Sequence, residues 1–124
     1  MPESDELATD IKEIRWRQES IDSSTDLLLK AHREAIIAEI ENFFGSSKRR
    51  VQVYLSIDGK KSVGEIAQML NMRQPNVSAD LANCAGEGLI ERIPCDAKGG
   101  FVYRKKRIDQ VLHISAFLRK KFGL

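Results

Sequence analysis

The sequence predicts a mainly α-helical protein with one small β-hairpin. Three observations predict it: residues 5–44 hold no proline or glycine, residues 62–88 hold two amphipathic helical stretches, and two short β-prone runs follow. At 124 residues the chain is long enough for one compact domain and an appended element. We therefore expect a helical arm at residues 1–44 and a domain at residues 45–124.

The arm carries a partial coiled-coil pattern. Apolar or small residues recur every seven positions, at Leu7, Ile14, Ile21, Leu28 and Ala35. The companion heptad positions are mostly polar, so the pattern is incomplete. Good N-cap residues at positions 23–26 leave open whether the arm is one long helix or two. Gly45, whose missing Cβ suits a C-terminal cap, is expected to end it.

Local signals place three further helices. Ser46 and Ser47 can cap a helix at residues 48–57, with Val51 and Leu55 facing a core and Tyr54 as a further candidate. Ser62 and Glu65 have the spacing of a capping box for a second helix. After a tight connection at residues 71–73, Pro75 suits the first turn of a third helix at residues 74–87.

The third helix has a clear apolar face. Val77, Leu81 and Cys84 recur with helical spacing and are expected inside. The remaining positions are expected toward solvent, with Ser78 at the boundary: Gln74, Asn76, Ala79, Asp80 and Asn83. The β-prone runs at residues 89–94 and 101–104 then flank a glycine-containing tip and predict a hairpin. A single helix is expected at residues 108–122.

Charge divides the chain into two parts. Residues 1–44 hold 11 acidic and 5 basic side chains, a net of −6, and residues 45–124 hold 7 and 15, a net of +8. Because clustered Lys and Arg attract phosphate and carboxylates repel it, the second part is expected to have an anionic partner.

The order helix, helix, tight turn, helix, hairpin is that of a winged helix-turn-helix. The segments EIAQMLN, QPNVSADL and GEGLIERI resemble the ArsR/MarR-like winged-helix regulators, over roughly residues 49–104. This resemblance implies that the helix at residues 74–87 enters the major groove of DNA and that the hairpin is a wing near the flanking backbone. The implied DNA contacts, together with the basic residues at the start of the domain's first helix, are Lys48, Arg49, Arg50, Arg73, Gln74, Asn76, Ser78, Lys98 and Arg104.

The chain departs from the family pattern in two ways. Family members often carry a basic residue or histidine where this chain has Ala79 and Asp80, and an exposed carboxylate near phosphates lowers affinity. Arg73 also replaces the usual Ser or Thr cap. The sequence therefore favours binding dominated by the DNA backbone over base readout.

These observations predict a transcriptional regulator that binds double-stranded DNA through the helix at residues 74–87 and the basic wing. The protein is expected to form a homodimer through its N-terminal and C-terminal helices. The alternative is a protein–protein interaction module, in which the winged core is a scaffold and the acidic arm binds a partner chain. A weaker third possibility is an architectural protein that binds duplexes without sequence preference.

The search for other chemistry is negative. The sequence has no phosphate-binding loop, nucleophile elbow or His-Glu-x-x-His motif, so we expect no enzyme activity, catalytic residue, cofactor or metal. Cys84 is expected in the core and Cys95 at the wing tip, without metal-ligand spacing. No run is long and apolar enough for a membrane span, and a cytoplasmic location is expected.

Overall fold

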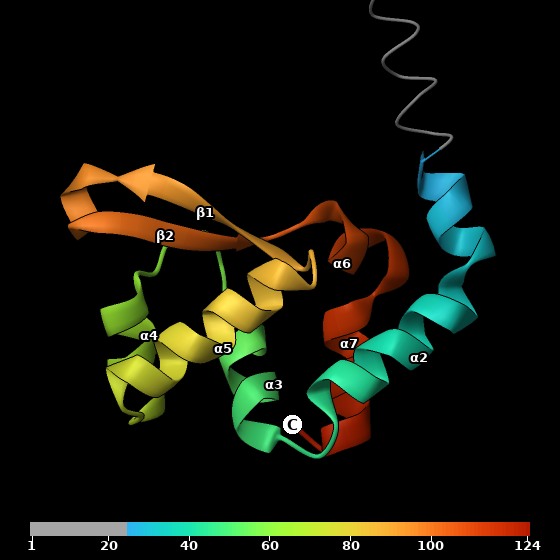
Figure 1. Cartoon of the computed structure of the whole chain (residues 1–124), viewed down its shortest axis with the longest axis horizontal. Helices are drawn as coiled ribbons and strands as arrows, with labels where there is room; N and C mark the ends of the chain where they lie inside the picture. The colour runs from blue at the N-terminus through green and yellow to red at the C-terminus, as the bar shows by residue number, and fades with distance from the viewer. Residues whose placement is uncertain (1–24) are drawn as a thin grey trace, which may run out of the picture.

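The computed structural model describes residues 25–124, and these residues form a winged helix-turn-helix (Figure 1). The predicted mainly α-helical class with a small hairpin is confirmed. In chain order the elements are α2 (Arg33–Phe44), α3 (Lys48–Leu55), α4 (Val63–Leu70), α5 (Gln74–Gly86), β1 (Ile90–Cys95), the short 3-10 helix η1 (Asp96–Lys98), β2 (Gly100–Lys105), α6 (Arg107–Leu112) and α7 (Ile114–Phe122).

The described part of the arm is helical with one interruption. Residues 25–31 are helical, and α2 follows after His32, whose φ is −103° and ψ is 15°. The interruption is small, because the amide of Ile36 still donates to the carbonyl of His32 at 3.0 Å. Gly45 ends α2 with φ at 55°, as predicted. The heptad positions before residue 25 lie outside the described residues.

One hydrophobic core joins α2 to the winged elements. Ile37, Ile40 and Phe44 of α2 are buried in the same cluster as the apolar faces of α3, α4, α5 and α7. Phe44 packs against Tyr54 of α3, with ring centroids 5.5 Å apart. The other buried members of this cluster are Val51, Val53, Ile57, Ile66, Ala67, Val77, Leu81, Cys84, Leu89, Ile90, Leu112, Ile114 and Leu118.

The predicted caps fix the helix boundaries. Ser47 Oγ accepts a hydrogen bond from the amide of Arg50, and Ser62 and Glu65 form a complete capping box at the start of α4. Asn71 ends α4 in the left-handed conformation with φ at 53°, which produces the tight turn into α5. The start and the end of α4 are thus specified by local residues, whereas α5 begins without a side-chain cap.

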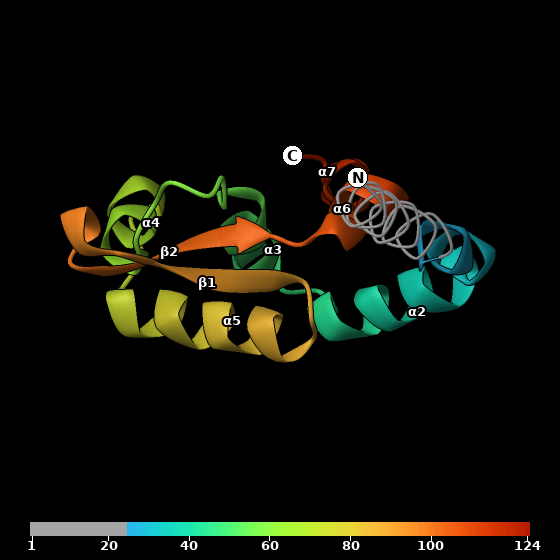
Figure 2. The ribbon, with the colours of Figure 1, turned by 90° about the horizontal axis from the view of Figure 1, so that it is seen from above.

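The hairpin lies across one side of the α3, α4 and α5 group (Figure 1). β1 and β2 are antiparallel, and Arg92 pairs with Tyr103 while Glu91 pairs with Arg104. The connection between α3 and α4 runs along the outer edge of β2, where the amide of Gly59 donates to the carbonyl of Tyr103 at 2.8 Å. Seen from above, α5 lies on one side of the hairpin, and α3 and α4 lie on the other (Figure 2).

The C-terminal region differs from the single helix that the sequence predicts. His113 adopts the left-handed conformation with φ at 56° and separates α6 from α7. The carboxylate of Asp109 stabilises this break, because it accepts hydrogen bonds from the amide and the hydroxyl of Ser115. After the break, Ile114 and Leu118 of α7 are buried in the core, and α7 packs against α3.

Asp109 also accepts a hydrogen bond from the hydroxyl of the fully buried Tyr54. Burial, and next the neighbouring Asp109 carboxylate, raise the pKa of Tyr54, so the hydroxyl stays a neutral donor. We predict that Tyr54→Phe lowers the free energy of unfolding by about 1.5–3 kcal/mol, the range for a hydrogen bond to a charged group. Chemical denaturation measures this loss.

Tyr103→Phe is the matched control, because Tyr103 is only half-buried and the structure gives its hydroxyl no partner among the described residues. Its effect should stay within about 0.5 kcal/mol. Equal losses in the two variants would contradict a specific role for the Tyr54 hydroxyl.

Candidate nucleic-acid interface

The exposed side of α5 carries small and uncharged side chains. Its sequence, QPNVSADLANCAG, contains one charged residue, Asp80, and that residue is buried. Small side chains line the outermost ridge of the helix, at Ala79, Ala82 and Gly86. A helix of this kind can approach another surface closely, and no exposed carboxylate on it repels phosphate.

The predicted exposure of Asp80 is wrong. Its side chain is 1% exposed and is held by two arginines of α3. Arg49 donates from Nε and Nη2 to the two carboxylate oxygens, at 3.0 and 3.2 Å, and the Nε of Arg50 lies 3.6 Å from Oδ1. A carboxylate can be buried only where charges and hydrogen bonds compensate for lost water, and α3 supplies both.

The three predicted basic residues at the start of α3 have different surroundings. The guanidinium of Arg50 donates to the carbonyl of Phe43 at 2.8 Å and lies 4.8 Å from the centroid of that ring, so it links α2 to α5. Arg49 is also bound to Asp80, but 49% of its side chain is exposed. Lys48 is exposed, and the structure gives it no ion pair within residues 25–124.

Both predicted wing cations are engaged by carboxylates. Lys98 at the tip binds Glu65 of α4 at 3.0 Å, which lowers the pKa of Glu65, and Arg104 binds its cross-strand partner Glu91. Exposed ion pairs of this kind contribute about 0–1 kcal/mol to stability, so another anion can replace the carboxylate at little cost. The predicted residues at the start of α5 differ, because the structure gives their side chains no ion pair within residues 25–124. These residues are all exposed: Arg73, Gln74, Asn76 and Ser78.

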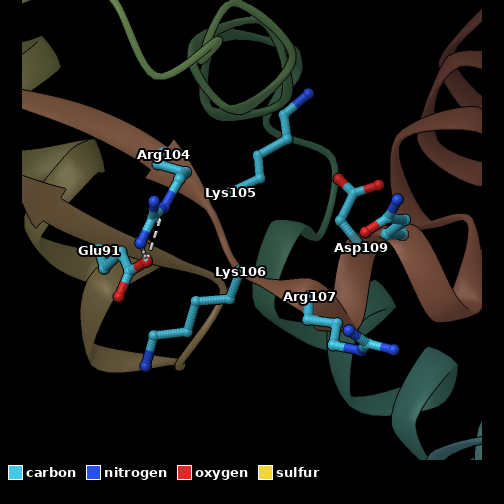
Figure 3. A pocket seen from close by; sticks show the side chains of 7 residues that line it. Glu91, Arg104, Lys105, Lys106, Arg107 and Asp109 are labelled. Atoms are coloured by element: carbon cyan, nitrogen blue, oxygen red, sulfur yellow. Dashed lines mark hydrogen bonds and ion pairs between the residues drawn. The ribbon is translucent and has the colours of Figure 1, made fainter. Parts of the chain in front are cut away.

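The run of basic residues from Arg104 to Arg107 does not form one surface. Four of these side chains line a pocket of about 530 Å³ at the base of the wing, with Glu91, Asp109 and Gln110. They diverge around it (Figure 3): Arg104 reaches Glu91, while Lys105 points to the opposite side. Lys105 donates to Ser115 at 2.9 Å, burial lowers its pKa, and Arg107 binds Asp26.

Sequence reasoning missed Arg92. This exposed residue of β1 lies 4.6 Å from the ring centroid of Phe101 and, with Tyr103, faces α5 across a groove of about 380 Å³. The alternation of strand residues could have placed Arg92 on one face, but the cross-strand register that brings Phe101 beside it was needed as well.

The structure also places the two cysteines. Cys84 is buried, as expected, and burial raises the pKa of its thiol to about 12, whereas Cys95 is half-buried. Within residues 25–124, no group of His, Cys, Asp and Glu side chains is arranged to hold a metal ion. No helix of that part of the chain is long and apolar enough to cross a membrane.

The ion-pair cluster at Asp80 makes a stability prediction. Asp80→Ala leaves two guanidinium groups without their carboxylate, and Arg50 is only 25% exposed. We expect the free energy of unfolding to fall by about 2–3 kcal/mol, below the range for fully buried pairs because Arg49 reaches solvent. Asp96→Ala, at the exposed wing tip, should change it by less than about 0.5 kcal/mol. Similar small losses in both variants would refute the compensating role of Asp80.

Comparison with known proteins gives little further identification. No protein-family model matches the sequence, and no curated protein matches it. One solved structure that resembles this chain is that of Streptococcus pneumoniae FabT in complex with DNA, with 15% sequence identity and a TM-score of 0.49. The match covers 80% of this chain and 76% of that one. The candidate interface is therefore defined by this chain's own geometry.

Proposed function

We propose that this protein is a transcriptional regulator that binds double-stranded DNA with α5 in the major groove. The observation that carries the proposal is the burial of Asp80, which leaves the exposed side of α5 free of carboxylates. A single α-helix fits the major groove, and small residues on its outer ridge let the backbone come close to the bases. The net charge of +8 over residues 45–124 supplies attraction to phosphate.

The residues at the start of α5 are the proposed readers of the groove. Gln74 and Asn76 carry amides that can bind adenine with two hydrogen bonds, and Ser78 can bind a base or a phosphate. Arg73 precedes them in an extended conformation and can reach phosphate or guanine. With no carboxylate beside them, base readout is open to this helix in addition to backbone contacts.

Phosphate contacts are proposed for Lys48 and Arg49 at the start of α3 and for Lys98 and Arg104 on the wing. Arg50 has a different proposed role, because its contacts with Phe43 and Asp80 hold α2, α3 and α5 together. On the wing, DNA phosphates would replace the carboxylates of Glu65 and Glu91 as partners of Lys98 and Arg104. The weakness of such exposed ion pairs makes the exchange feasible.

The salt dependence of binding tests this proposal. We predict that the protein binds a random duplex at low salt, and that Lys48→Gln weakens binding on all sequences and lowers the log–log salt slope by about 0.9. Fluorescence anisotropy at several salt concentrations measures both quantities. The matched control is Lys121→Gln, because Lys121 pairs with Glu41. Its helix, α7, lies on the opposite side of the view from α5 (Figure 2).

The titration distinguishes a defined DNA contact from general electrostatic attraction and from no DNA binding. Absence of salt-sensitive binding by the wild-type protein would refute DNA binding and favour the protein-interaction module. Equal slopes for wild type and Lys48→Gln would remove Lys48 from the interface. An equal fall in slope for both variants would indicate general attraction without a defined contact.

We also propose a homodimer formed through the N-terminal and C-terminal helices. Leu27 and Leu28 support it, since they are 66% and 61% exposed on adjacent positions of one helix. A two-fold dimer would present two copies of α5 to successive major grooves, about 34 Å apart.

Dimerisation through the arm predicts that Leu27→Glu combined with Leu28→Glu shifts the protein from dimer to monomer in sedimentation velocity. Met69→Glu is the control, because Met69 is the exposed apolar residue of α4, away from the arm. A wild-type monomer, or a dimer that survives the double substitution, would contradict this role of the arm.

A further inference from the structure

The groove between α5 and the hairpin has polar groups on both walls. Ser78 and Ala82 line it from α5, and Arg92 and Tyr103 line it from the hairpin. Its volume is about 380 Å³, and small α5 side chains keep it open. The hydroxyls of Ser78 and Tyr103 have no hydrogen-bond partner among the described residues, so three donor side chains share one groove.

Arg92 differs from the other cations of the hairpin in its partner. Lys98 and Arg104 bind carboxylates, and Lys105 turns inward to Ser115. Arg92 lies over the Phe101 ring, and the structure gives it no carboxylate partner within residues 25–124. Stacking holds a guanidinium in place through its flat face and leaves the N–H groups at its edge free.

Helical geometry places a second arginine on the opposite flank of α5. Successive residues are about 100° apart around a helix, so Ser78 and Asp80 lie on opposite sides of the ridge formed by Ala79 and Ala82. Ser78 borders the groove with Arg92, and Asp80 binds Arg49 from α3. The neutral ridge therefore has one exposed guanidinium on each side. Asp80 holds the guanidinium of Arg49, and the ring of Phe101 holds that of Arg92.

We infer that the groove between α5 and the hairpin receives one sugar–phosphate strand of the duplex, and that Arg92 is its phosphate contact. Arg49 contacts the backbone on the other side of the same major groove. Charge complementarity supports this occupant, because a helix in the major groove has a phosphate chain along each flank. The inference rests on the proposed function and adds a residue that the family resemblance did not supply.

Arg92 is the proposed binding residue and Phe101 its positioning residue. Arg92→Gln should weaken binding to any duplex about tenfold and lower the log–log salt slope by about 0.9. Phe101→Leu keeps the charge, so it should weaken binding with little change in slope. Arg92→Lys should restore the slope but only part of the affinity, since an ammonium lacks the planar stacking face.

The matched control is Lys121→Gln, because Lys121 lies on α7 and pairs with Glu41 of α2. It removes the same unit of charge outside the proposed interface. It should leave the affinity and the slope nearly unchanged. Circular dichroism melting should show the same folded state for all four variants, because Arg92, Phe101 and Lys121 are exposed.

The results separate this inference from the proposed function. If wild type binds duplex DNA with salt sensitivity, but Arg92→Gln binds with the same affinity and slope, the inference is overturned and the proposed function stands. The same holds if Lys121→Gln lowers the slope as much as Arg92→Gln does. If wild type does not bind, the proposed function fails, whatever the variants do.

Discussion

The buried carboxylate of Asp80 is the interaction on which the position of α5 depends. It receives two hydrogen bonds from Arg49, and the guanidinium of Arg50 lies beside it while also contacting Phe43 at the end of α2. Three helices thus meet at one charge, which could not be buried without these partners. The same burial removes the carboxylate from the outer face of α5, so a single interaction both orients this helix and makes its exposed side compatible with phosphate.

A second carboxylate, Asp109, performs a similar task at the C-terminal end. It accepts hydrogen bonds from Tyr54 in the core and from Ser115 at the start of α7. These contacts stabilise the break at His113 and direct α7 back along α3 and α2. Lys105 joins this cluster through Ser115 and lies 5.1 Å from the centroid of the Tyr54 ring. One residue of the basic run is thereby committed to the core and does not contribute to the surface.

These contacts divide the basic residues into three groups that composition cannot distinguish. Arg50 and Lys105 are partly buried and hold elements together, so their charge is not free for a ligand. Lys98 and Arg104 have exposed carboxylate partners, which contribute little and can be exchanged. Lys48, Arg73 and Arg92 remain as exposed cations around α5. A net charge of +8 therefore indicates the kind of partner, and the pairing pattern indicates which residues can meet it.

Local sequence patterns were sufficient to predict most helix boundaries, the hairpin and most of the core, because caps, turns and apolar periodicity act over a few residues. Ser62 with Glu65, Gly45, and the face formed by Val77, Leu81 and Cys84 all occur where local patterns place them. Three features depend on contacts between elements: the burial of Asp80, whose partner Arg49 is 31 residues away, the break at His113, and the position of Arg92 over the Phe101 ring. An analysis of helical periodicity assigns a charged residue to the exposed face because the residue is polar. Whether a charged side chain is buried depends on a compensating charge that another element supplies. Candidate DNA contacts could thus be named from residue type, but their availability depends on contacts between elements that no local pattern encodes.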